Sequence, residues 1–298
     1  DTNQLEVENL NEINREFSRL NEHILSANIN YQHDFAFGDF TPTLKMGGYT
    51  EYRTREYNTR LFIYSWKNGL PSNYRVMNVP DELMQDKNYG EDKLYLLEQV
   101  DWRNNYEGNN MLGAGYAGVN LPFGKWNIYA GVRFEHSRME LISNTQKNEK
   151  SPTSVYYTYD DFFPSLNAAY RLNEQHQFRL SYGRTVNRPE FREVSSSVYY
   201  DFDLASNVQG NYDLKAAYID NIDLGYEYYP SNGELISVSL FYKKFKNPIE
   251  WTYTVAAGTA LIYSYINAKG ADNYGVEVDI RKNLDFIGMK NFSLSLNG

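Results

Sequence analysis

The chain has 298 residues, a formal net charge of −9, 28 tyrosines and no cysteine. The absence of cysteine excludes disulfides and cysteine-ligated zinc. The acidic balance argues against nucleic acid as a partner, because phosphate binding needs clustered Lys and Arg. No run approaches the roughly 20 apolar residues of a membrane-spanning helix, whereas abundant tyrosine suits strands whose ends lie at a membrane interface.

Alternating apolar and polar side chains dominate the chain after a polar, acidic stretch over residues 1–23, which we interpret as a loop or a strand extension. Successive side chains of a strand point to opposite faces, so this alternation predicts strands. We expect about ten, centred on residues 24–32, 44–53, 112–121, 126–135, 166–172, 178–187, 222–229, 236–243, 274–281 and 292–296.

Short turns and long links alternate between these strands. Short turns are expected near residues 38, 123, 174, 231 and 286, and long irregular links over residues 55–110, 144–156, 188–221 and 246–273. In an up-and-down barrel this alternation places every short turn at one rim and every long link at the other. We therefore expect an all-β fold, a partial antiparallel up-and-down transmembrane β-barrel, with residues 1–298 forming one barrel segment.

The two faces of the expected strands differ in polarity. Ile222, Leu224 and Tyr226 would face lipid, while Asp223 and Glu227 would face a polar lumen. Charges on the lumen face are expected to pair between neighbouring strands. These charges are Arg133, Glu135, Arg179, Asp223, Glu227, Glu277, Asp279 and Arg281.

Three segments resemble a known family in its order. Ser181-Tyr182-Gly183-Arg184-Thr185-Val186-Asn187-Arg188-Pro189 is similar to the S-x-R-T-x-x-R-P strand end of TonB-dependent outer-membrane receptors, particularly those of Bacteroides-like bacteria. Residues 210–215 resemble the family's G-N-P-x-L-K segment, with Tyr212 in place of proline, and residues 242–249 resemble its Y-K-K-x-K-N-x-I ending. The three segments fall within residues 181–249, a stretch of about a quarter of the chain.

This resemblance implies a plugged barrel of about 22 strands in the outer membrane of a Gram-negative bacterium. This chain would be its middle-to-late part, without the plug domain. The implied activity is TonB-coupled uptake of a scarce nutrient, with siderophore, cobalamin, glycan and peptide all open. The implied partners are outer-membrane lipid, the TonB energy-transducing complex acting through a plug absent from this chain, the small nutrient ligand, and a surface lipoprotein.

The sequence contains no enzyme motif: H-E-x-x-H, G-x-S-x-G and the phosphate-binding G-x-x-x-x-G-K are all missing, and the four histidines are scattered. We therefore assign no catalytic residue, metal site or cofactor. Candidate ligand contacts are aromatic side chains of the long links and the arginine at a strand end, where pairing with nearby carboxylates is the competing interpretation of the arginine. The candidates are Tyr64, Trp66, Trp102, Tyr106, Arg188, Tyr199, Tyr200, Trp251 and Tyr253, with Tyr263 and Tyr265 as further loop aromatics.

Two other classes of function remain open. A soluble or surface β-rich glycan-binding module would bury the face of Ile222, Leu224 and Tyr226 against a second sheet. A barrel enzyme would need a nucleophile and a base at the rim, and the missing motifs weigh against it.

Overall fold

The structure is a computed structural model that describes residues 5–6, 14–66, 76–77, 85–90, 92–201, 203–255, 261–289 and 291–298. The chain divides into two compact units. The first comprises residues 1–22, 55–107 and 142–154, and the second comprises residues 23–54, 108–141 and 155–298. No helix of the described residues has the length and apolar character needed to cross a membrane.

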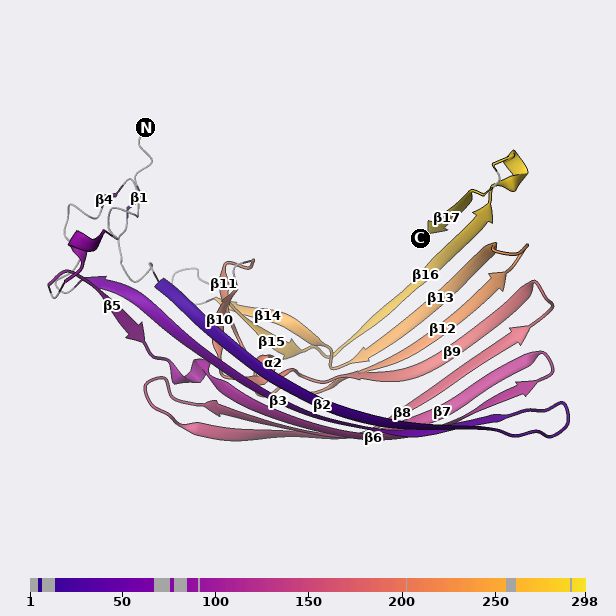
Figure 1. Ribbon diagram of the computed structural model, residues 1–298, viewed down its shortest axis with the longest axis horizontal. Helices are drawn as coiled ribbons and strands as arrows, with labels where there is room; N and C mark the ends of the chain where they lie inside the picture. Colours follow the sequence, from indigo (N-terminus) through magenta and orange to yellow (C-terminus); the bar gives the residue numbers. More distant parts are fainter. Residues whose placement is uncertain are drawn as a thin grey trace. The chain divides into compact units, whose positions relative to one another are not determined.

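Antiparallel strands joined in sequence order make up the main sheet (Figure 1), so the all-β, up-and-down fold is confirmed. Its order is β17-β16-β13-β12-β9-β8-β7-β6-β3-β2, with β5 pairing to β3. The strands are β2 (Asn14–Asp34), β3 (Thr43–Trp66), β5 (Leu94–Gln99), β6 (Tyr106–Phe123), β7 (Trp126–Asn144), β8 (Pro152–Arg171), β9 (His176–Asn187), β12 (Ala217–Tyr228), β13 (Leu235–Lys246), β16 (Gly270–Asn283) and β17 (Ser293–Asn297). Among the strands that the structure describes, β17 and β2 are not paired with each other.

All ten expected strands are present, and several are longer than the alternation indicated. The expected irregular link over residues 55–110 is wrong at both ends, because β3 continues to Trp66, β6 begins at Tyr106, and β5 lies between them. The expected link over residues 144–156 shrinks to residues 145–151 between β7 and β8. Backbone hydrogen bonds to neighbouring strands extend β3, β6, β7 and β8 through residues whose side chains do not alternate between apolar and polar.

One face of the second unit's sheet carries rows of apolar side chains. The registers of β9, β12, β13 and β16 place Leu180, Leu224, Leu240 and Val276 in one row. The next row contains Tyr182, Ile222, Tyr242 and Tyr274. Leu224 is 49% exposed and Val276 59% exposed, so no second sheet of the described residues covers this face as a soluble sandwich would require.

Charged residues bound this apolar band at both ends of the strands. Beyond the tyrosine row lies a charged row of Arg184, Asp220, Lys244 and Asp272. Tyr182 donates a hydrogen bond to Asp220 over 2.9 Å, and Tyr242 donates one to Asp272 over 2.5 Å. At the other end, Lys282 pairs with Glu234 at 2.8 Å.

The height of the band follows from the ten residue steps from Asp272 to Lys282 on β16. At roughly 3.4 Å per residue they span about 34 Å along the strand. A strand tilt of about 40° reduces this to about 26 Å, close to the apolar band of about 25 Å on an outer-membrane barrel.

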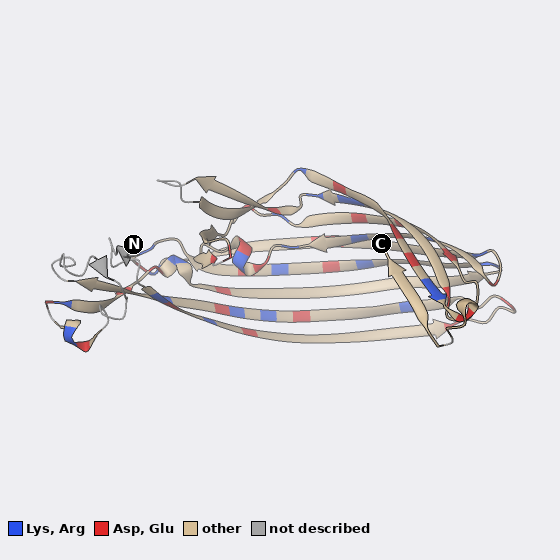
Figure 2. Cartoon of the chain, turned by 90° about the horizontal axis from the view of Figure 1, so that it is seen from above, with Lys and Arg blue, Asp and Glu red and all other residues tan. Residues whose placement is uncertain are grey.

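The opposite face is polar, and of the charge pairs expected between neighbouring strands the described residues show one, Arg179 with Glu227. Arg179 on β9 contacts Glu227 on β12 at 2.9 Å, and Ser181 donates to Asp223 at 3.2 Å. Arg133 pairs with Glu135 at 2.7 Å along β7. Figure 2 shows acidic and basic residues distributed along the strands that carry this face.

A second, small sheet lies in the long links of the second unit, where the sequence predicted irregular structure. Its order is β10-β11-β15-β14. The elements are α2 (Phe191–Val194), β10 (Val198–Asp201), β11 (Ser206–Gln209), β14 (Ile249–Val255) and β15 (Leu261–Asn267). The first unit adds the short pair β1 (Leu5–Glu6) and β4 (Val76–Met77).

Candidate functional site

Arg188 fastens the start of the link segment, which we define as residues 188–216, to the polar face of the main sheet. Its guanidinium lies 2.8 Å from Glu135 on β7 and 2.9 Å from Asp161 on β8. All three side chains are largely buried, at 18%, 12% and 10% exposure. Tyr218 on β12 donates a further hydrogen bond to Asp161 over 2.6 Å. Arg188 therefore pairs with carboxylates, as the competing interpretation expected, and its role as a ligand contact stays a prediction.

The next residues of the link segment pack against β3 and β6. Glu190 pairs with Arg53 at 3.1 Å, and the Arg53 guanidinium lies 5.4 Å from the centre of the Phe191 ring. Phe191 is 1% exposed and lies over Gly108, where an added Cβ would collide with the ring. A glycine is thus required on β6 for this aromatic side chain to reach the sheet.

A capping box and a backbone hydrogen bond then hold the short helix α2 in place. The Glu193 carboxylate accepts a hydrogen bond from the backbone N–H of Glu190 over 2.9 Å. In return, the Glu190 side chain accepts one from the backbone N–H of Glu193. The backbone N–H of Asn211 donates to the carbonyl of Glu193 over 2.6 Å. Burial raises the pKa of Glu193, with a smaller contribution from the nearby Glu190 charge.

The link segment also holds the small sheet and its aromatic side chains. Asn211 donates through its side chain to the backbone carbonyl of Tyr265 over 2.8 Å, and the hydroxyls of Tyr199 and Tyr265 lie 3.3 Å apart. The Arg192 guanidinium stacks 3.2 Å from the centre of the Tyr199 ring. Trp251 packs against Tyr265 at a ring separation of 4.7 Å.

The predicted site residues fall into two groups, one in each unit. Five lie in the second unit: Tyr199 and Tyr200 on β10, Trp251 and Tyr253 on β14, and Arg188 directly after β9. Trp251 and Tyr253 belong to β14 and Tyr263 and Tyr265 to β15, so the expected loop over these residues is a paired hairpin. Trp251, Tyr253 and Tyr200 are exposed, at 52%, 60% and 45%.

The other four predicted residues belong to the first unit, where each contacts its own neighbours. Tyr64 and Trp66 lie on β3, opposite Leu96 and Leu94 of β5. Tyr106 begins β6, is 3% exposed and packs on Tyr57 at 5.3 Å.

Trp102 lies in the 3-10 turn Trp102–Asn104 of the same unit. The backbone N–H of Trp102 donates to the backbone carbonyl of Lys147 over 2.9 Å, and the Lys150 ammonium lies 4.7 Å from the centre of the Trp102 ring.

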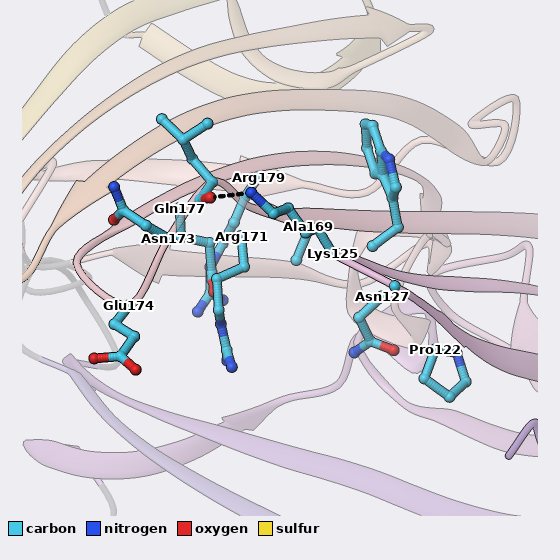
Figure 3. Close-up of a pocket in the computed structure, with 12 residues that line it drawn as sticks. Pro122, Lys125, Asn127, Ala169, Arg171, Asn173, Glu174, Gln177 and Arg179 are labelled. Carbon is cyan, nitrogen blue, oxygen red and sulfur yellow. Dashed lines mark hydrogen bonds between the residues drawn. The ribbon is translucent and has the colours of Figure 1, made fainter. Parts of the chain in front are cut away.

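A cavity that no sequence pattern predicted lies at the short-turn end of the second unit and is drawn in Figure 3. Its volume is about 840 Å³. Lys125, Arg171 and Arg179 line it together with Glu174. Lys125 donates to the carbonyl of Leu172 over 2.6 Å. Among the residues that the structure describes, no carboxylate pairs with the guanidinium of Arg171. In the sequence, the cavity is indicated only by a basic residue beside each of two short turns, Lys125 and Arg171.

Comparison with protein families gives a match over almost the whole chain. A family model described as TonB dependent receptor-like, beta-barrel, matches residues 4–298. No curated protein matches the sequence.

Solved structures with the same arrangement of strands share little sequence with this chain. The unliganded ferric citrate transporter FecA is similar with a TM-score of 0.62 and 14% identity, over 95% of this chain and 36% of that one. The ferric-catecholate import receptor Fiu from K12 E. coli is similar with a TM-score of 0.56 and 15% identity, over 90% of this chain and 36% of that one. The chain thus spans about a third of the length of these structures, and the likeness concerns the fold.

Proposed function

The chain belongs to the TonB dependent receptor-like β-barrel family, and from this premise we propose that it forms part of a receptor importing a scarce nutrient by TonB-coupled uptake. Barrels of this family are outer-membrane proteins of Gram-negative bacteria, which gives the location of this chain. The family is one of transport receptors, not of enzymes.

The observation that carries the proposal is the contrast between the two faces of the main sheet. The apolar face is exposed, and the band between its bounding charged residues would be about 26 Å high at a typical strand tilt, as a lipid-facing wall requires. The polar face receives the link segment through Arg188 and Phe191. A wall with lipid on one side and folded links on the other suits a receptor that captures its ligand from outside.

The proposal includes the parts that the resemblance implied. In this proposal residues 1–298 would form one segment of the barrel wall. The plug would come from elsewhere in the protein and connect the receptor to the TonB complex. A surface lipoprotein would cap the long-link rim, and the source would be a Bacteroides-like bacterium.

The proposed ligand contacts are the nine residues named from the sequence. Exposure ranks Trp251, Tyr253 and Tyr200 first, because an exposed ring is available for stacking. Tyr106 ranks last, since its ring is buried against Tyr57.

Growth on defined nutrients tests this function. The gene for the full receptor is deleted, and growth is compared on limiting ferric siderophores, on limiting cobalamin, on peptides and on neutral oligosaccharides. We expect one condition to fail, to be restored by the intact gene, and to fail equally in a strain without the energy-transducing protein. Equal growth of the deletion strain and its parent under every condition would refute the proposal.

A further inference from the structure

Basic side chains from two neighbouring turns meet in the cavity at the short-turn end. Lys125 precedes β7 and lies opposite Arg171 at the end of β8, because the backbone N–H of Arg171 donates to the carbonyl of Lys125 over 2.8 Å. On β9, Gln177 lies opposite Arg171. The next pair on this face is Ala169 with Arg179. The two arginine side chains therefore extend in the same direction, as Figure 3 shows.

The cavity is open because a small residue lies between long ones. The methyl group of Ala169 fills little of the space between the arginines, and the cavity has a volume of about 840 Å³. Asn127 and Asn173 also line it. The side-chain oxygen of Asn173 accepts hydrogen bonds from two backbone N–H groups of its own turn, over 3.0 Å and 2.9 Å, which leaves its amide NH2 group to donate.

Carboxylates of β12 neutralise only the Arg179 side of the cavity. Glu227 contacts Arg179 at 2.9 Å. The same carboxylate accepts hydrogen bonds from Gln177 over 3.3 Å and from Tyr229 over 2.7 Å, so it is fully used. Asp223 lies on the same face of β12. Both acidic residues are separated from Arg171 by β9, since the sheet runs β12-β9-β8.

Lys125 and Arg171 carry charges that no carboxylate of the described residues pairs with. The Lys125 ammonium donates to the carbonyl of Leu172 over 2.6 Å, which is an uncharged partner. Glu174 lines the cavity from the turn after β8, yet it forms no ion pair with either base. Like charges at opposed positions of a sheet repel each other. An anion between the two cations would relieve this repulsion.

We propose that this cavity binds a phosphate group, held by Lys125 and Arg171 with the amides of Asn127 and Asn173 as further donors. A phosphate monoester carries about 1.5 to 2 negative charges at pH 7 and so matches two cations, whereas a single carboxylate matches one. The guanidinium can bind two phosphate oxygens at once, and the ammonium acts as a point charge.

The position of the cavity favours a phosphate group in solution over the headgroup of a lipid. Arg171 and Arg179 extend from the polar face of the sheet, opposite the apolar face that we assign to lipid. The short turns of bacterial outer-membrane barrels face the periplasm, where soluble phosphate compounds have access to this rim. The inference goes beyond the proposed function, because it assigns a binding site whatever the receptor imports.

Calorimetric titration of the purified full-length receptor with inorganic phosphate, at constant ionic strength, tests the proposal. We expect saturable binding, about tenfold weaker after Arg171→Gln or Lys125→Gln. Both side chains are exposed, so these variants should fold. Ala169→Glu should also weaken binding, because it introduces a competing carboxylate. Arg138→Gln is the matched control: it makes the same change in charge near the other end of β7, where the guanidinium packs on the ring of Tyr156, and should leave the affinity unchanged.

A second titration separates the two sources of phosphate. The receptor is placed in nanodiscs that contain phosphatidic acid, with phosphatidylcholine discs as the reference. Three results would overturn the proposal: no saturable binding of inorganic phosphate, equal weakening by Arg138→Gln and Arg171→Gln, or a response that depends on Arg171 only in the phosphatidic acid discs. The last result would assign the site to membrane lipid. None of these results bears on uptake, which the growth experiment tests separately.

Discussion

The two ends of the second unit's strands differ in packing and in charge. At the long-link end the links fold onto the polar face, and Phe191, Val194 and Val208 are at most 1% exposed. At the short-turn end the links are tight turns, and a cavity of about 840 Å³ is open between basic side chains. The same strands thus support a packed, aromatic region at one end and a cavity lined by three basic side chains and Glu174 at the other.

The length of a link determines where buried contacts form. A turn such as residues 172–175 has too few residues to return to the sheet, so Arg171 stays exposed. The link segment has 29 residues, enough to bring Phe191 to β6 and Asn211 to β15. We expect substitutions at the long-link end to have the larger effects.

The largest effect is expected for Phe191→Ala. Removing this buried ring leaves a cavity over Gly108 and should destabilise the link segment by about 3–5 kcal/mol. Protease digestion of the folded receptor should then cut within residues 188–216. The matched control is Phe286→Ala, which removes a 70% exposed ring and should leave the digestion pattern unchanged. Resistance of the Phe191 variant equal to that of the parent would contradict the packing described.

Arg188→Ala should have the next largest effect. It leaves Glu135 and Asp161 as buried carboxylates without their cation, at a cost of about 3 kcal/mol. Hydrogen exchange of the link segment should accelerate. Arg188→Lys should rescue the segment only in part, because one ammonium replaces two directed guanidinium contacts. Full rescue by lysine would show that a positive charge is enough to hold the link segment without the directed guanidinium contacts.

The ion pair of Glu234 and Lys282 should give a smaller, pH-dependent effect at the short-turn end. The hydrogen bond from Lys282 lowers the pKa of Glu234 below its usual value, with burial acting in the opposite direction. The pair therefore stabilises the fold above the ordinary pKa of a glutamate, and this contribution is lost as the pH falls through the lowered value. Lys282→Gln should raise the Glu234 pKa, measured by carbon NMR of labelled glutamate. An unchanged titration would show that the pair does not form.

The smallest effect is expected for Arg171→Gln in the cavity. The side chain is exposed and no carboxylate among the described residues pairs with it, so stability should change by less than about 0.5 kcal/mol. Denaturant unfolding of the receptor measures this. A loss comparable to that of Arg188→Ala would mean that the short-turn end also contains a buried charge network.

The sequence predicted the main sheet because one pattern, alternation with period two, determines both a strand and its faces. Ile222 and Asp223 were assigned to opposite faces correctly, and the register confirms their rows. The ends of the strands were not predicted correctly. Tyr64 and Tyr106 were expected in a loop, because hydrogen bonds to neighbouring strands, not side-chain alternation, carry β3 and β6 that far.

The site was predicted less completely. Pairing of Arg188 with carboxylates was expected, but its partners Glu135 and Asp161 lie 53 and 27 residues away and no local pattern names them. Trp251 and Tyr253 were identified as candidates without the hairpin that aligns them. The cavity beside Arg171 depends on two turns separated by about 50 residues, so only the folded chain reveals it.

Cysteine scanning from Asn221 to Tyr228 in the full-length receptor, in whole cells, tests most directly the claim that this sheet is a membrane wall. This chain has no native cysteine to interfere. A water-soluble maleimide should label cysteines at Asp223 and Glu227 faster than those at Ile222, Leu224 and Tyr226, and a lipid-borne quencher should reach only the second set. Protection of the Ile222 set from both water and lipid would place the strand in a soluble core and contradict the account.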